Sequence, residues 1–243
     1  MDGACYCHEC HFGTADGPVH EKSGTEIQRC AVMGRCKLKI HNLTKKYDGK
    51  TVLDQFSLQL PSTGTVCLFG PSGCGKTTLL NCIAGLEPFD SGEIEEAGTG
   101  KISYLFQENR LLPWISAKDN IAAVLRGKAG ENAEQAKKWL GLVGLAEEGN
   151  KGPAELSGGM RRRVALARAL AYGGDLYLMD EPFQGLDAER RDEMIALLQK
   201  ETAGALKIIV THDFEEAEML ADVIYILEGP PVRIADIIVK NSA

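Results

Sequence analysis

A glycine-rich segment at residues 70–77 carries the strongest chemical signal in the sequence. It reads Gly70-Pro71-Ser72-Gly73-Cys74-Gly75-Lys76-Thr77 and fits the pattern G-x-x-x-x-G-K-[ST] completely. In such a loop, successive backbone N–H groups turn toward phosphate oxygens, the lysine adds a positive charge at the β- and γ-phosphates, and the threonine hydroxyl can bind Mg²⁺. We predict that these residues, with the adjacent Thr78, hold nucleotide phosphates. The alternative, a chance match in a glycine-rich turn, is disfavoured by the flanking strand and helix patterns.

Two adjacent carboxylates, Asp180 and Glu181, follow the apolar run at residues 176–179. A buried strand that ends in such a pair places both groups at the carboxyl edge of the sheet, where open α/β sheets bind ligands. We therefore predict that Asp180 binds Mg²⁺ and that Glu181 acts as a general base toward the attacking water. Taken alone, such a pair is more often a solvated helix start, but the phosphate-binding loop upstream favours the catalytic interpretation.

Short continuous apolar runs precede both motifs and predict buried strands. The run at residues 65–69 leads into the glycine-rich loop and then into the helical pattern KTTLLNCIAGL. The strand patterns DLYLMDE and LKIIVTH are separated by a helical pattern at residues 188–204. This alternation predicts a parallel sheet with right-handed crossovers.

Two further regions have a different pattern. Residues 37–60 alternate apolar and polar side chains around Asp48-Gly49, a turn signal, and predict an antiparallel sheet. Residues from about 108 to 170 are mostly helical, with apolar residues at intervals of three and four. We expect an α/β fold over residues 37–243: a mainly parallel sheet flanked by helices, an N-terminal antiparallel β subdomain and an inserted α-helical subdomain.

Composition limits the classes of protein. The chain has 243 residues, 44% hydrophobic and 25% charged, with a net charge of -7, so a broad basic surface for nucleic acid is not expected. No run approaches the roughly 18 apolar residues of a membrane-spanning helix, and no export signal is evident, so we expect a cytoplasmic protein. The basic cluster of Arg161, Arg162, Arg163 and Arg168 is interpreted as a solvated helix face, with a nucleic-acid patch as the alternative.

The cysteines suggest two hypotheses. Residues 1–36 form a Cys- and His-containing extension that we expect to be disordered or weakly structured. It carries enough soft ligands for zinc, although their spacing fits no standard zinc module, and an upstream leader before a true start at Met33 is the alternative. The ligand candidates are Cys5, Cys7, His8, Cys10, His11, His20, Cys30 and Cys36.

Separately, Cys74 lies near a helix N-terminus and is a candidate reactive thiol whose alkylation would block nucleotide binding; an inert loop residue is the alternative.

Residues 37–230 resemble the ATP-binding-cassette (ABC) ATPases. The most specific match is Leu156-Ser157-Gly158-Gly159-Met160, which is similar to the ABC signature, although the usual form ends in Gln where this chain has Met160. In the family, the signature of one subunit closes over ATP bound to the loop of another. The resemblance therefore implies a homodimer in which Ser157, Gly158 and Gly159 contact ATP. An N-cap role for Ser157 is the structural alternative and is compatible with this one.

The resemblance implies roles for four more residues. Gln107 resembles the Q-loop glutamine that reaches Mg²⁺ and the attacking water, and His212 resembles the histidine that contacts the γ-phosphate. Asp187, in Gly185-Leu186-Asp187, is similar to the D-loop aspartate at the nucleotide interface. Tyr47 resembles the aromatic residue that stacks on adenine. For single residues the alternative is ordinary packing.

The segment FQENRLLPWISAKDNI resembles the ATPases of nitrate, sulfonate, taurine and related organic-ion importers. It implies an ATP-hydrolysing subunit at the cytoplasmic face of the cell membrane, which works with a separate permease and an extracytoplasmic solute-binding protein. Packing of Leu111, Leu112 and Trp114 against the core is the local alternative. The alternative functions are a soluble ABC ATPase that acts on ribosomes or DNA, and a nucleotide-regulated scaffold with little turnover.

Overall fold

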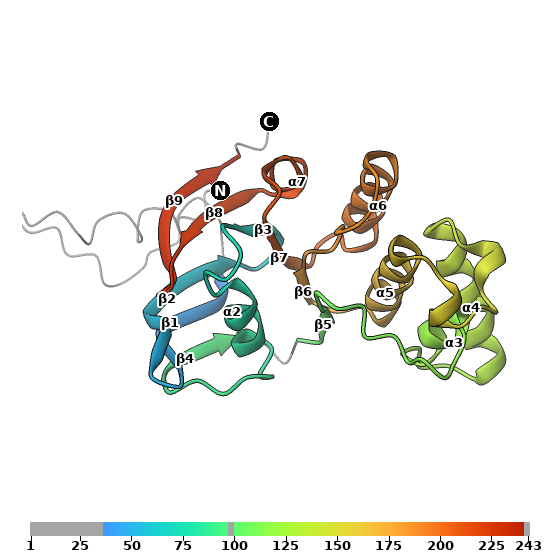
Figure 1. Ribbon diagram of the computed structural model, residues 1–243, viewed down its shortest axis with the longest axis horizontal. Helices are drawn as coiled ribbons and strands as arrows, with labels where there is room; N and C mark the ends of the chain where they lie inside the picture. Colours follow the sequence, from blue (N-terminus) through green and yellow to red (C-terminus); the bar gives the residue numbers. More distant parts are fainter. Residues whose placement is uncertain (1–35, 97–99, 241–243) are drawn as a thin grey trace, which may run out of the picture.

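The apolar runs form one six-stranded sheet in the computed structural model of the chain, which describes residues 36–96 and 100–240 (Figure 1). The strand order is β5-β6-β7-β3-β8-β9; the first five strands are parallel, and β9 runs antiparallel to β8. The bounds are β3 Gly64–Phe69, β5 Ile102–Leu105, β6 Leu176–Asp180, β7 Leu206–Thr211, β8 Val223–Glu228 and β9 Arg233–Val239. The mainly parallel sheet is confirmed, whereas the patterns above predicted no strand at β5, β8 or β9.

The register of this sheet brings the chemical motifs together. Phe69 pairs with Thr211 across β3 and β7, and Asp180 pairs with Val210 across β6 and β7. Because these strands are parallel, their carboxyl ends meet at one edge of the sheet. The glycine-rich loop, the two carboxylates and His212 therefore leave the sheet at the same edge.

A second sheet is antiparallel, as predicted, with strand order β2-β1-β4. Its strands are β1 Cys36–Tyr47, β2 Lys50–Pro61 and β4 Ser91–Glu96. The turn between β1 and β2 is the expected Asp48-Gly49 pair, and both residues have positive φ angles, 47° and 81°. Such angles twist a two-residue turn in the sense that matches the flanking strands, so this dipeptide closes the hairpin.

Helix α2, Lys76–Ile83, lies between the two sheets (Figure 1). Its Leu79 and Leu80 are fully buried in a core that includes residues of both sheets. Each such leucine contributes about 1.5–3 kcal/mol of transfer free energy. Because α2 begins directly after the glycine-rich loop, this packing holds the loop in place.

The other face of the large sheet is covered by helices that share a second core. They are α5 Gly158–Tyr172, α6 Ala188–Glu201 and α7 Phe214–Leu220, while α3 Ala117–Ala122 and α4 Ala129–Leu142 extend the helical region away from the sheet (Figure 1). Short 3₁₀ turns occur at Ala146–Glu148 and Pro153–Glu155. The inserted helical part of the fold is confirmed; α3 is shorter than its apolar pattern, which continues to residue 127.

Most of the residues named in the zinc hypothesis lie outside the described part of the chain. The same holds for nearly all of residues 1–36, which were expected to be disordered or weakly structured. Within residues 36–96 and 100–240, no group of three or more His, Cys, Asp or Glu residues is arranged to hold a metal ion. The zinc hypothesis and the domain boundary near residue 37 therefore stay predictions.

Candidate nucleotide-binding site

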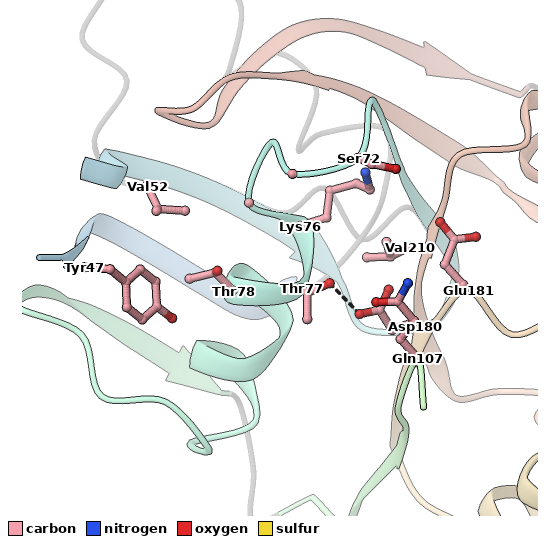
Figure 2. Close-up of a pocket in the computed structure, with 12 residues that line it drawn as sticks. Tyr47, Val52, Ser72, Lys76, Thr77, Thr78, Gln107, Asp180, Glu181 and Val210 are labelled. Carbon is pink, nitrogen blue, oxygen red and sulfur yellow. Dashed lines mark hydrogen bonds between the residues drawn. The ribbon is translucent and has the colours of Figure 1, made fainter. Parts of the chain in front are cut away.

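One cavity of about 360 Å³ lies where the loop after β3 meets the end of β6 (Figure 2). It is lined by residues from both sheets, and most of them were predicted from the sequence. The lining residues are Tyr47, Val52, Ser72, Gly73, Gly75, Lys76, Thr77, Thr78, Gln107, Asp180, Glu181 and Val210. Among these, the sequence patterns did not identify Val52 and Val210, because an apolar residue in a strand has no signal that separates a pocket wall from the core.

The glycines at two positions of the loop are required by close contacts. Gly75 has a φ angle of 114°, and a Cβ atom there would lie 2.6 Å from Cγ2 of Val232 and 2.8 Å from Cγ1 of Val52. At Gly70, a Cβ atom would lie 2.4 Å from the carbonyl oxygen of Leu227. A side chain at either position would displace the loop, so the backbone path that exposes its N–H groups depends on glycine.

The ammonium group of Lys76 is held inside the loop. Its Nζ donates to the carbonyl oxygens of Gly70 at 2.7 Å and Pro71 at 2.8 Å, and the residue is only 6% exposed. The same lysine is the first residue of α2, whose positive dipole end faces the cavity side of the loop. Two sources of positive potential therefore coincide at this point, which is the arrangement that binds phosphate.

Thr77 and Asp180 meet across 103 residues of sequence. Oγ1 of Thr77 donates to Oδ2 of Asp180 at 2.6 Å, as the dashed line in Figure 2 shows. Burial raises the pKa of Asp180, and the Thr77 hydrogen bond with the charges of Lys76 and Arg162 opposes that rise. A hydroxyl and a carboxylate oxygen are hard ligands that Mg²⁺ accepts, and Gln107 lies beside them on the cavity wall. The Thr77 hydroxyl, the Asp180 carboxylate and the Gln107 amide are therefore suitable ligands for a Mg²⁺ ion that accompanies a triphosphate held by the loop of Lys76.

Glu181 and His212 form a pair at the same edge. Oε1 of Glu181 lies 2.7 Å from Nδ1 of His212. Glu181 has a positive φ angle of 50°, which is uncommon for a residue with a side chain, and its N–H donates to the carbonyl of Val210 at 2.9 Å. The carboxylate raises the pKa of His212, first through this hydrogen bond and then through its charge. A carboxylate held in this way can accept a proton from water in the cavity.

The arginines of α5 differ from the expectation. Their sequence pattern predicts a solvated helix face, but Arg162 is only 3% exposed. Each of the four donates hydrogen bonds to main-chain carbonyl oxygens: Arg161 to Leu156, Arg162 to Asp180, Arg163 to Val143 and Arg168 to Arg110. That interpretation is therefore wrong, because this helix packs against loops whose carbonyl groups need donors.

Cys74 lies in the loop, but its side chain points into the core. The residue is fully buried, and its Sγ lies 3.8 Å from Nζ of Lys76. An alkylating reagent reaches this thiol only when the loop opens. The predicted reactivity thus depends on loop motion, and the role of the residue in nucleotide binding stays a prediction.

The signature residues lie away from this cavity. Ser157 caps α5, where its Oγ accepts from the N–H of Met160 at 3.2 Å, and both Ser157 and Gly158 are exposed. Asp187 caps α6 in the same way, accepting from the N–H of Arg190 at 2.9 Å. Among the predicted site residues, those that do not line the cavity are Gly70, Pro71, Cys74, Ser157, Gly158, Gly159, Asp187 and His212.

The segment after Gln107 presents an aromatic residue to solvent. Trp114 is 76% exposed and does not pack against the core, whereas Leu111 is partly buried against it, so the packing alternative holds for Leu111 and not for Trp114. The loop around it is held by Asn120, which is 1% exposed and whose side chain accepts from the N–H of Leu112 at 2.7 Å and donates to three carbonyl groups. The role of Asn120 could not be predicted from the sequence, because an asparagine within a helical pattern has no signal for burial.

Known proteins share this chain's sequence and fold. A family model described as ABC transporter matches residues 53–184. The taurine import ATP-binding protein TauB of Pseudomonas aeruginosa is 42% identical over 198 residues, which cover 76% of this chain and 74% of that protein. The aliphatic sulfonates import ATP-binding protein SsuB of Pectobacterium atrosepticum is 44% identical over 200 residues, which cover 79% and 74%.

A solved structure agrees with these matches. The dimeric structure of a post-hydrolysis state of the ATP-binding cassette MJ0796, bound to ADP and Pi, superimposes with a TM-score of 0.72 at 29% identity, over 78% of this chain and 93% of that one. The loop that holds Lys76, the Thr77–Asp180 contact and Glu181 lie within residues 53–184, which the family model matches. The chain belongs to the ABC transporter family of ATP-binding cassettes.

Proposed function

We propose that this chain is the ATP-hydrolysing subunit of an importer of the nitrate, sulfonate and taurine type. The observation that carries this proposal is the convergence of Lys76, the Thr77–Asp180 contact and Glu181 on one cavity. The relatives named for taurine and aliphatic sulfonate import support the choice of solute class.

The residues of the cavity divide the work of phosphoryl transfer. The loop N–H groups and Lys76 bind the β- and γ-phosphates, while Thr77, Asp180 and Gln107 would hold Mg²⁺. Bound there, Mg²⁺ would neutralise charge that develops on the phosphate oxygens. Glu181 accepts the proton of the attacking water, and His212, fixed by Glu181, donates toward the γ-phosphate. Tyr47 lies at the far side of the cavity (Figure 2). There it would stack on the adenine ring of bound ATP.

The complete site needs two copies of the chain. Ser157, Gly158 and Asp187 are exposed and do not line the cavity of their own chain, so they are free to contact nucleotide held by a partner. The dimeric cassette with ADP and Pi supports this arrangement. We infer a homodimer in which two ATP molecules lie at the interface.

The exposed Trp114 is the proposed contact for the permease. It follows Gln107 closely in sequence, so a partner bound there would act on the Q-loop directly. No helix within the described parts of the chain has the length and apolar character needed to cross a bilayer. Separate permease subunits and an extracytoplasmic solute-binding protein complete the proposed assembly, which places this chain at the cytoplasmic face of the cell membrane.

The test compares ATP turnover and nucleotide binding in purified variants. Glu181→Gln keeps ATP affinity but lowers turnover by about 100-fold or more, because the general base is lost. Lys76→Ala weakens nucleotide binding itself, and Glu189→Gln, an exposed substitution on α6, serves as the matched control with normal turnover. Unchanged turnover in Glu181→Gln would remove the assigned base, and normal affinity in Lys76→Ala would remove the phosphate-loop assignment.

Co-purification separates the proposal from the soluble alternative. Recovery of integral-membrane proteins with the tagged chain supports import. Recovery of ribosomes or DNA in their place supports the soluble ABC ATPase, and a Trp114→Ala variant that recovers membrane partners as well as the parent would contradict the proposed docking residue.

A further inference from the structure

The guanidinium nitrogens of Arg162 all donate hydrogen bonds to main-chain carbonyl oxygens. A guanidinium has five N–H donors, and five main-chain carbonyl oxygens surround this one, with Oδ1 of Asn109 as a further acceptor 3.4 Å from Nη1. Nη1 donates to Phe106 at 2.6 Å and Gln107 at 3.1 Å. The remaining donors bind main-chain carbonyl oxygens at and just after the end of β6. Nη2 donates to the carbonyl oxygens of Asp180 at 2.6 Å and Glu181 at 2.5 Å, and Nε donates to that of Pro182 at 3.0 Å.

These contacts join three parts of the site. The 106–107 loop follows β5 and carries Gln107, and the end of β6 carries the two carboxylates that line the cavity. Arg162 itself belongs to α5, the helix that begins at the Ser157 cap. One buried side chain therefore ties the signature helix to both the metal-binding and the water-activating sides of the cavity.

The chemistry of the position favours arginine over other polar residues. Lysine has three donors and glutamine has two, so neither can replace a planar group that satisfies five acceptors. Burial lowers the pKa of Arg162 to about 10, and the nearby charges of Asp180 and Glu181 act against that shift, so the group stays charged at neutral pH. Its loss would leave buried carbonyl groups without donors.

We propose that Arg162 is a positioning residue that holds the 106–107 loop and the end of β6 at one fixed separation. Its side chain does not line the cavity; it acts through the main chain of residues that do. This inference rests on the ATP hydrolysis proposed above. Because the side chain of Gln107 must reach the metal and the same water that Glu181 activates, a small change in the separation of the two residues lowers the rate of the chemical step more than it lowers nucleotide affinity.

The test uses Arg162→Gln and Arg162→Lys, with Arg163→Gln as the matched control. Arg163 is the next residue on α5 and also donates to main-chain carbonyls, Val143 at 2.7 Å and Gly144 at 3.3 Å, but both lie within the helical region. Turnover is measured per nucleotide-binding site, titrated with a fluorescent ATP analogue, so that a partly unfolded sample does not distort kcat. We expect kcat to fall on the order of 10- to 100-fold in both Arg162 variants while KM for ATP stays near the parent value. Arg163→Gln keeps the parent kcat.

Two results would overturn the proposal. Equal loss of kcat in Arg163→Gln and Arg162→Gln would mean that α5 simply needs its arginines for stability, and melting temperatures recorded in parallel identify that case. Full recovery of kcat by Arg162→Lys would mean that charge alone is required, in place of the carbonyl contacts.

A double-mutant cycle tests the route through the Q-loop. If Arg162 acts by positioning Gln107, then Gln107→Ala already removes part of its effect, and the combined loss in kcat is smaller than the product of the single losses. Independent, multiplicative losses would contradict this route. Parent protein that fails to hydrolyse ATP, or hydrolyses it equally with Glu181→Gln, would refute the proposed function, whereas a failure confined to the Arg162 variants would refute only this inference.

Discussion

Nδ1 of His212 lies 2.7 Å from Oε1 of Glu181, although the two residues are 31 positions apart and come from the ends of different strands. The carboxylate is largely buried, while the histidine side chain is 55% exposed. An ionised carboxylate beside an imidazole favours the charged imidazole, so this contact connects the protonation of His212 to the presence of Glu181.

An NMR titration of the histidine Cε1–H signals tests that connection. The pKa of His212 should lie above its usual value of 6.5 and should fall in Glu181→Gln, because the hydrogen bond and the negative charge are then lost. The pair stabilises the fold fully below about pH 6.5, and this stabilisation is lost as pH rises through the raised pKa of the folded state. A His212 pKa at or below 6.5 in the parent would contradict the observed geometry.

Replacement of Asp180 should separate stability from activity. Burial raises the pKa of Asp180, so the folded state disfavours its charged form. Asp180→Asn removes that charge and still accepts from Thr77, and we expect the nucleotide-free protein to melt a few degrees higher, since about 1 kcal/mol corresponds to about 2–4 °C for a chain of this size. Magnesium-dependent turnover should be lost. Differential scanning calorimetry, with the exposed Asp54→Asn as control, measures the shift, and a lower melting temperature would contradict the prediction.

Tyr47 should contribute to recognition of the base and not of the phosphates. It is 39% exposed at the cavity edge, and Nζ of Lys45 lies 4.6 Å from the centre of its ring. Tyr47→Ala should weaken ATP binding by up to about tenfold, whereas Tyr47→Phe keeps the ring and the affinity. Calorimetric titration with inorganic tripolyphosphate provides the control, because a ligand without a base should bind Tyr47→Ala normally. Equal weakening for both ligands would assign Tyr47 a structural role.

Alkylation of Cys74 should report on opening of the phosphate loop. Because the thiol is fully buried beside Lys76, modification should be slow, should block ATP binding once it occurs, and should be slowed further by Mg-ATP. Peptide mass spectrometry compares its rate with those of the buried Cys67 and Cys82 in the same molecule. A Cys74→Ser variant that loses activity to the reagent as fast as the parent would show that another thiol is responsible.

Much of the fold and part of the site could be predicted from the sequence because the relevant signals are local. The apolar runs of β3, β6 and β7 are strands buried on both faces, and the glycines of residues 70–77 are needed for backbone angles and close contacts within the loop. The strands β5 and β9 were missed because short or half-exposed strands have patterns shared with loops. The strand β8 is a mostly buried apolar run that the sequence patterns above did not include.

The sequence by itself determined a strand, a phosphate-binding loop and a helix at residues 64–83, since spacing and glycine content control such structure within a few residues. Only the tertiary structure decided that Arg162 is buried among carbonyl groups from residues 106–107 and 180–182, and that Asn120 holds the loop around Trp114. A polar residue on a helix has the same periodic pattern whether its partners are water or the main chain of distant segments. Its environment is therefore established only when the strands fold into one sheet and bring those segments together.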